Sequence, residues 1–208
     1  MLNNPAARKV VSGVIEPPAR LLLRLHVSPD AVTIVGTILT VAAALVFLPQ
    51  GWFVAGVIVI GLLGMSDLLD GTMARMSGTS GQWGNFLDAT LDRLADGAIF
   101  GGVALYGAFH DQPWITAGAL LALVTGQVTS YAKARAEAVG ASANVGIAER
   151  AERLILVGAA ALLAGLGVPY VLPAVLWLLG ALGLITIGQR IWTVRSQLRP
   201  RPDSQAHG

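Results

Sequence analysis

The chain has 208 residues, of which 54% are apolar and only 12% are charged. A soluble domain usually carries roughly 25% charged residues, and this excess of apolar side chains does not fit inside one ordinary core. We therefore expect a membrane-embedded protein with no nucleic-acid partner. The sequence contains no cysteine, which excludes disulfides, thiolate metal sites and a thiol nucleophile.

Apolar stretches long enough to cross roughly 30 Å of hydrocarbon recur along the chain. They predict an all-α membrane protein with six transmembrane helices, at residues 31–48, 52–69, 86–108, 114–139, 153–166 and 171–192. The fifth stretch is the shortest. We find no convincing internal repeat, which argues against an inverted-repeat transporter.

Three regions are expected along the chain. Residues 1–30 form an N-terminal juxtamembrane segment, in which leucine and valine alternate with basic and small residues as in an interfacial amphipathic helix. Pro17 and Pro18 should break or kink this helix, and a disordered basic tail is the alternative. Residues 31–195 form the six-helix domain, and residues 196–208 form a disordered cytoplasmic tail.

The basic residues indicate the orientation of the predicted helices. All fourteen Lys and Arg residues fall on one side of the six spans. Short cytoplasmic loops are enriched in Lys and Arg. We therefore expect a multi-pass protein of the cell (inner) membrane, in contact with membrane lipids, with both termini in the cytoplasm.

Five aspartates lie at or just inside the cytoplasmic ends of the second and third predicted spans: Asp67, Asp70, Asp88, Asp92 and Asp96. An ionised side chain within a span is costly unless it is paired, hydrated or bound to a cation. The helical spacing places the first two on one face and the other three on another. Any single aspartate could instead be a solvated loop residue or a helix cap with an arginine partner, but the grouping favours a functional site.

Converging carboxylates repel one another unless cations intervene, and two divalent ions would balance four negative charges. Ligands that are all oxygen favour magnesium, manganese or calcium, and the lack of nearby His or Cys argues against zinc. A pair of metal ions about 4 Å apart is a common device for displacement at phosphorus. We therefore expect two Mg²⁺ ions, with Mn²⁺ as the alternative.

A glycine-rich loop separates the two aspartate faces. Residues 76–83 have the sequence MSGTSGQW, with Gly71 before them and Gly84 after them. Small residues let the backbone approach a phosphate or a base closely, although no lysine follows at the Walker spacing. Arg75 could grip a phosphate or neutralise an aspartate, and we favour the phosphate.

The complete pattern resembles the signature of the CDP-alcohol phosphotransferase family, whose fixed positions it matches throughout: Asp67-x2-Asp70-Gly71-x2-Ala74-Arg75-x8-Gly84-x3-Asp88-x3-Asp92. The six predicted spans extend the resemblance over nearly the whole chain. The resemblance implies transfer of a substituted phosphate group from a CDP-linked donor, usually CDP-diacylglycerol, to an alcohol, with release of CMP.

The same resemblance implies roles for the aspartates. Asp67, Asp70 and Asp88 would be metal ligands. Asp92 would be both a ligand and the general base that takes the acceptor's proton as its oxygen attacks the β-phosphorus. Asp96 lies outside the motif and is interpreted as a hydrogen-bonded or ion-paired residue one turn further along.

The donor side of the site is also implied by the resemblance. Residues 28–33 are similar to the family's segment before the first span, which approaches the cytidine diphosphate. The residues implied in donor binding are Asp30, Thr33, Gly71, Ala74, Arg75, Gly81 and Gly84.

A second basic group bears on the acceptor. Lys133 and Arg135 end the fourth predicted span, Arg150 and Arg153 enter the fifth, and Arg190 lies near the end of the sixth. Five cations around one cytoplasmic cavity would suit a phosphorylated acceptor, and we expect Lys133, Arg153 and Arg190 to be the most buried. The alternative is the ordinary positive-inside bias with anionic-lipid contact.

Residues 130–137 (SYAKARAE) and 146–154 (GIAERAERL) resemble the bacterial phosphatidylinositol phosphate synthases, which join CDP-diacylglycerol to inositol 1-phosphate. This similarity implies acceptor binding by Ser130, Lys133, Arg135, Arg153 and Arg190. Phosphatidylglycerophosphate synthase, which uses glycerol 3-phosphate, is the alternative, and the family implies a homodimer. A cation-coupled transporter is the alternative from another class, but its carboxylates should lie near the midplane of the membrane.

Overall fold

The structure is a computed structural model that describes residues 5–147 and 149–199. These residues form eight α-helices joined by turns and loops, and no β-strand occurs within the described ranges. The predicted all-α class is confirmed. The chain divides into two compact units, Met1–Asp111 and Gln112–Gly208, and each is described by itself.

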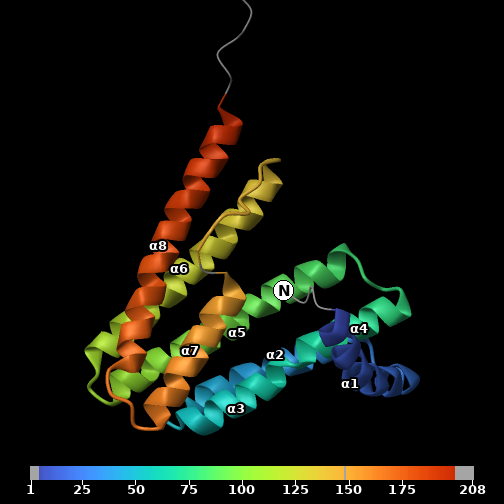
Figure 1. Ribbon diagram of the computed structural model, residues 1–208, viewed down its shortest axis with the longest axis horizontal. Helices are drawn as coiled ribbons and strands as arrows, with labels where there is room; N and C mark the ends of the chain where they lie inside the picture. Colours follow the sequence, from blue (N-terminus) through green and yellow to red (C-terminus); the bar gives the residue numbers. More distant parts are fainter. Residues whose placement is uncertain (1–4, 148, 200–208) are drawn as a thin grey trace, which may run out of the picture. The chain divides into compact units, whose positions relative to one another are not determined.

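The first unit contains five helices: α1 (Pro5–Arg24), α2 (Pro29–Phe47), α3 (Phe53–Gly64), α4 (Ser66–Ser77) and α5 (Gln82–Phe109). Helix α2 contacts α3, α4 and α5, while α1 contacts α4 (Figure 1). The approach of α5 to α2 depends on Gly102, where a Cβ atom would lie 2.8 Å from the carbonyl oxygen of Ala44. The first unit is therefore organised around α2.

Helix α1 continues through Pro17 and Pro18, so the predicted break does not occur there. Proline has a helix-compatible φ, but within a helix it removes one backbone hydrogen bond and its ring crowds the carbonyl group four residues earlier. Ile15 and Ala19, four residues apart on one face, are both buried on either side of the proline pair. Their burial supports the helix across the two missing hydrogen bonds.

The ends of α2 and α4 are fixed by local chemistry. Ser28 caps α2 by accepting a hydrogen bond of 3.2 Å from the backbone N–H of Ala31, and Pro29 occupies the first helical position. Helix α4 ends at Gly78, whose φ of 69° lies in the left-handed region that glycine adopts without strain. These ends place the beginning of α2 and the loop after α4 at defined positions.

The second unit contains α6 (Pro113–Ala138), α7 (Arg150–Gly165) and α8 (Val171–Leu198). Helix α8 contacts both α6 and α7, and its Leu172, Leu176 and Leu179 are almost completely buried. The predicted disordered tail begins too early, because α8 extends to Leu198. Residues 200–208 of that predicted tail lie outside the described residues.

In the part of the chain that the structure describes, four helical segments are long and apolar enough to cross a membrane: Pro29–Phe47, Phe53–Ser77, Pro113–Ala138 and Val171–Leu198. The protein is therefore a membrane protein. The other two predicted spans are also helices, α5 and α7, but α7 has only 16 residues and α5 carries several charged side chains. The second predicted span continues as far as Ser77, so the first aspartates lie on a helix rather than beyond its end.

Candidate functional site

Asp70 is the most buried of the four aspartates predicted to bind metal. It lies on α4 and is only 7% exposed. Its Oδ2 accepts a hydrogen bond of 2.5 Å from Thr33 Oγ1 on α2. Asp67 and Asp88, which are both exposed, act electrostatically on Asp70. Three carboxylates from α4 and α5 therefore share one region of the first unit.

The donor atoms in this region suit a hard divalent cation, because they are all carboxylate or hydroxyl oxygens. Within residues 5–147 and 149–199, however, no three His, Asp or Glu side chains converge closely enough to hold a metal ion. Asp70 is fixed by Thr33, whereas Asp67 and Asp88 are exposed. The type of ligand thus fits the predicted metal, and the side chains are near one another without forming a closed site.

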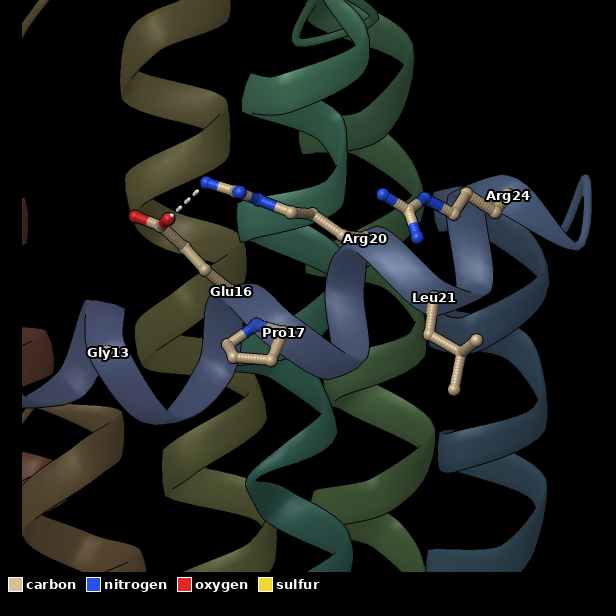
Figure 2. A pocket seen from close by; sticks show the side chains of 6 residues that line it. All are labelled: Gly13, Glu16, Pro17, Arg20, Leu21 and Arg24. Carbon is tan, nitrogen blue, oxygen red and sulfur yellow. Dashed lines mark hydrogen bonds and ion pairs between the residues drawn. The ribbon is translucent and has the colours of Figure 1, made fainter.

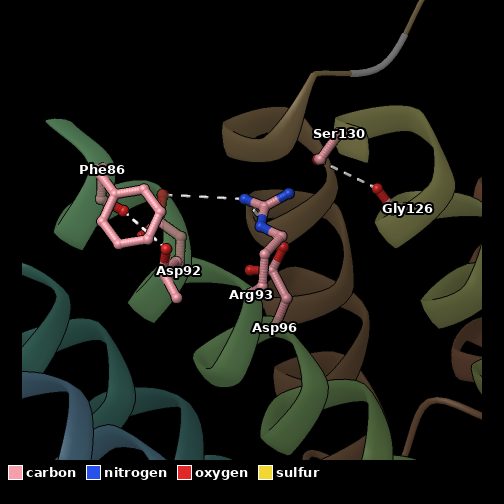
Figure 3. A network of polar contacts seen from close by, with 7 residues as sticks. Phe86, Asp92, Arg93, Asp96, Gly126 and Ser130 are labelled. Carbon is pink, nitrogen blue, oxygen red and sulfur yellow. Dashed lines mark hydrogen bonds and ion pairs between the residues drawn. The ribbon is translucent and has the colours of Figure 1, made fainter. Parts of the chain in front are cut away.

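Asp92 and Asp96 both pair with Arg93 on α5. Arg93 Nη2 lies 3.8 Å from Asp92 Oδ2 and 3.7 Å from Asp96 Oδ2, as Figure 3 illustrates. The interpretation of Asp96 as an ion-paired residue is confirmed. Arg93 was not among the predicted site residues, although its i,i+3 spacing to Asp96 was visible in the sequence.

Three of the predicted donor-binding residues lie on α4: Gly71, Ala74 and Arg75. Arg75 is exposed, and its Nη2 donates a hydrogen bond of 2.9 Å to Thr72 Oγ1. Its Nη1 would lie 3.6 Å from a Cβ atom at Gly71, so the guanidinium folds back along α4. Ala74, which precedes Arg75 in the chain, is partly buried.

The beginnings of α2 and α5 are joined by a tryptophan that sequence reasoning missed. Trp83 Nε1 donates a hydrogen bond of 2.8 Å to Asp30 Oδ2. Trp83 lies between Gly81 and Gly84, and Gly81 has an extended backbone that any residue can adopt. The structure therefore brings the predicted donor residues Asp30, Gly81 and Gly84 into one neighbourhood, through a side chain whose long-range bond no local spacing could reveal.

In the second unit, Arg190 is buried at 5% exposure and is held by backbone carbonyl groups. Its Nε donates to the carbonyl of Val145 at 2.9 Å, and its Nη1 donates to the carbonyl of Thr129 at 2.5 Å. Arg190 thereby joins α8 to both α6 and the loop between α6 and α7. Its predicted burial is confirmed.

The other predicted acceptor residues differ in exposure. Arg153 on α7 is buried at 4% exposure, and Ser130 on α6 is partly buried. Lys133 and Arg135 are both exposed near the end of α6, so the prediction that Lys133 is buried is wrong. Lys133 occupies a solvent-facing position of the last turns of α6, where burial cannot be inferred from its place in the chain.

Residues 142–147 of the loop between α6 and α7 are bound to one helix. Gln197 on α8 accepts from Ser142 N at 2.8 Å and donates to Ser142 O at 2.7 Å. Thr186 Oγ1 accepts from Ile147 N at 3.3 Å. With Arg190, these side chains fix the loop at three points along α8. Sequence reasoning missed Gln197 and Thr186, because polar helix residues give no local sign of a loop partner.

Similar proteins identify the family of this chain. The sequence model described as CDP-alcohol phosphatidyltransferase matches residues 26–193. The chain is 48% identical over 202 residues to the phosphatidylinositol phosphate synthase of Streptomyces avermitilis, covering 93% of this chain and 83% of the relative.

Solved structures of a Mycobacterium tuberculosis phosphatidylinositol phosphate synthase are also similar. The form with CDP-DAG bound has a TM-score of 0.84 and 42% identity, over 90% of this chain and 98% of that chain. The form in complex with manganese and citrate has the same score and identity, over 89% and 92% of the two chains. Because the family match extends over most of the sequence and includes every signature aspartate, the chain belongs to the CDP-alcohol phosphatidyltransferase family.

Proposed function

We propose that the protein transfers the phosphatidyl group of CDP-diacylglycerol to inositol 1-phosphate, forming phosphatidylinositol phosphate and releasing CMP. The family to which it belongs makes it a transferase of phospholipid biosynthesis. The observation that carries the proposal is the complete aspartate signature on α4 and α5, in a chain 42% identical to a synthase crystallised with CDP-DAG bound. The names of its relatives favour inositol 1-phosphate over glycerol 3-phosphate.

We assign two Mg²⁺ ions, with Mn²⁺ as the alternative, to Asp67, Asp70, Asp88 and Asp92. When bound, the ions would offset the negative charge of the pyrophosphate during the transfer. Asp70 would be the fixed ligand because it is buried and held by Thr33. The exposed side chains of Asp67 and Asp88 would rotate toward it, and such rotamer changes take nanoseconds or less. The manganese complex of the mycobacterial relative supports a divalent-ion requirement.

Asp92 is assigned as the general base. Its carboxylate would take the proton of the acceptor hydroxyl as that oxygen bonds to the β-phosphorus. The bond from this phosphorus to the bridging oxygen breaks, and CMP leaves with both electrons of that bond. The ion pair with Arg93 Nη2, at 3.8 Å, would orient the carboxylate.

The donor would lie along α4 and the beginnings of α2 and α5. The exposed guanidinium of Arg75 could exchange the hydroxyl of Thr72 for a donor phosphate, because a charge-assisted bond is stronger than a neutral one. The donor set proposed from the family is Asp30, Thr33, Gly71, Ala74, Arg75, Gly81 and Gly84.

The acceptor phosphate would be bound by Ser130, Lys133, Arg135, Arg153 and Arg190 in the second unit. Arg153 and Arg190 would form its buried part, and the exposed Lys133 and Arg135 would attract the acceptor from the cytoplasm. Two N–H groups of Arg190 donate to backbone carbonyls and so fix the loop. Its remaining N–H groups would bind the acceptor phosphate.

The membrane arrangement is part of the same proposal. All six predicted spans would cross the inner membrane, α5 and α7 included, with the site and both termini in the cytoplasm. Helix α1 would lie at the interface, since Arg20 and Arg24 extend to one side of it and Leu21 to the other (Figure 2). On that polar side, Arg20 Nη2 forms an ion pair of 2.9 Å with Glu16 Oε2. We also propose a homodimer, as the family implies.

The experiment is CMP release by the purified protein from CDP-diacylglycerol with Mg²⁺, comparing inositol 1-phosphate, glycerol 3-phosphate, free inositol and serine. The proposal expects metal-dependent release with inositol 1-phosphate alone. Release with glycerol 3-phosphate instead would keep the aspartate chemistry and replace the acceptor. No release with any acceptor would contradict the donor assignment and favour the transporter alternative.

A further inference from the structure

Two residues assigned to the acceptor site come from different helices and meet at one glycine of α6. Ser130 Oγ donates a hydrogen bond of 3.2 Å to the carbonyl oxygen of Gly126 (Figure 3). Arg153 of α7 places its guanidinium against the same residue. A Cβ atom at Gly126 would lie 2.5 Å from Arg153 Nη1 and 3.0 Å from its Cζ.

The contact involves the flat, charged end of Arg153 and not its aliphatic part. Any side chain at position 126 would overlap the guanidinium, and Arg153 is only 4% exposed, so it must move within a packed environment. A guanidinium recognises phosphate through N–H groups whose directions are fixed relative to one another. A small displacement would therefore misalign these donors relative to Ser130.

Glycine within a helix is unfavourable relative to alanine, and a neighbour that leaves no room for a side chain is one reason for its presence. Gly158 on α7 provides a contrast, because a Cβ atom there would meet no atom within 4 Å. At Gly126 the reason is the space that the guanidinium occupies.

We propose that Gly126 is a positioning residue for the acceptor: its missing side chain sets the place of the Arg153 guanidinium beside Ser130. Arg153, and Ser130 once its hydroxyl turns from the Gly126 carbonyl, can then bind the phosphate of a phosphorylated polyol. The inference rests on the proposed function, because that function assigns Ser130 and Arg153 to the acceptor. Gly126 itself does not touch the reacting atoms.

The test is a double-mutant cycle in the full-length protein, with CMP release measured against acceptor and donor concentrations. Gly126→Ala should raise the KM for inositol 1-phosphate about ten-fold, with kcat and the KM for CDP-diacylglycerol changed by less than about two-fold. Gly158→Ala is the matched control and should change none of these constants. Lysine lacks the planar group that overlaps the added methyl, so in an Arg153→Lys background Gly126→Ala should add less than about two-fold.

The inference is overturned if Gly126→Ala leaves the acceptor KM unchanged, or if its effect is equally large in the Arg153→Lys background. If Gly126→Ala lowers the yield of folded protein, the double variant must restore that yield, and failure to do so also overturns it. Failure of the proposed function is a separate result, because the wild type would then not use inositol 1-phosphate. The double-mutant cycle would then be measured with glycerol 3-phosphate as the acceptor, and the same changes in the acceptor KM would support or overturn the inference.

Discussion

The two compact units hold their charged residues by different means. In the first unit, Asp70 is bound by the Thr33 hydroxyl, and Asp92 is paired with Arg93. In the second unit, Arg190 is bound to two backbone carbonyls. In the first unit the exposed side chains of Asp67 and Asp88 can change rotamer, whereas Asp70 is held in place. We therefore expect the proposed metal site to form when Asp67 and Asp88 turn toward Asp70, and the proposed acceptor site around Arg190 to be formed before the acceptor binds.

The largest effect is expected when the proposed base of the first unit is removed. Asp92→Asn should lower kcat by roughly 10³-fold, because the amide cannot accept the acceptor's proton. Binding of CDP-diacylglycerol and Mn²⁺, followed by calorimetry, should remain, since the amide oxygen can still act as a ligand. Asp111→Asn changes an exposed aspartate in the turn before α6, where φ is 53°, and should have no effect. An active Asp92→Asn variant would remove Asp92 from the role of base.

The second unit is tested by Arg190→Lys. A lysine keeps the charge but cannot donate to the carbonyls of Thr129 and Val145 in the geometry of a guanidinium. The KM for inositol 1-phosphate should rise roughly 30-fold, corresponding to about 2 kcal/mol, with little change in the KM for CDP-diacylglycerol. Arg195→Lys, in the last turn of the same helix, is the control. An equal rise in both KM values would contradict a preformed acceptor site.

The next test concerns Gln197, which holds the loop between α6 and α7. Gln197→Ala removes both hydrogen bonds to Ser142 and should weaken the loop by about 2 kcal/mol. Hydrogen exchange at residues 142–147 should become faster, and the acceptor KM should rise about three-fold. Gln197→Glu can still accept from Ser142 N, but its second carboxylate oxygen would repel Ser142 O, so exchange should also be faster than in the wild type. Unchanged exchange in Gln197→Ala would contradict the role of Gln197.

The smallest effect is expected at Trp83 in the first unit. Trp83→Phe keeps the aromatic ring and loses the hydrogen bond to Asp30. The KM for CDP-diacylglycerol should rise about two- to three-fold, because the beginnings of α2 and α5 are then less firmly joined. Trp52→Phe alters another exposed tryptophan of this unit and is the control. A change in the acceptor KM, with the donor KM unaltered, would show that the two units do not divide the substrates in this way.

The sequence predicted relations within one helix better than contacts between distant parts of the chain. Helical periodicity placed Asp67 and Asp70 on one face, and the ion pair of Asp96 with Arg93 is likewise a relation within one helix, three residues apart. The bond from Trp83 to Asp30, and those from Gln197 to Ser142, join residues more than fifty positions apart. Each of the six stretches chosen by hydropathy is helical in the structure, but hydropathy could not show that α1 continues through its prolines.

The proposed metal site of Asp67, Asp70, Asp88 and Asp92 can be observed by diffraction at the manganese absorption edge, from crystals of this protein grown with Mn²⁺ and CDP-diacylglycerol. We expect two anomalous peaks, each about 2 Å from carboxylate oxygens of these aspartates, with Asp67 and Asp88 turned toward Asp70. Peaks elsewhere, or carboxylates that remain apart while the ions contact only the nucleotide, would contradict the proposed site.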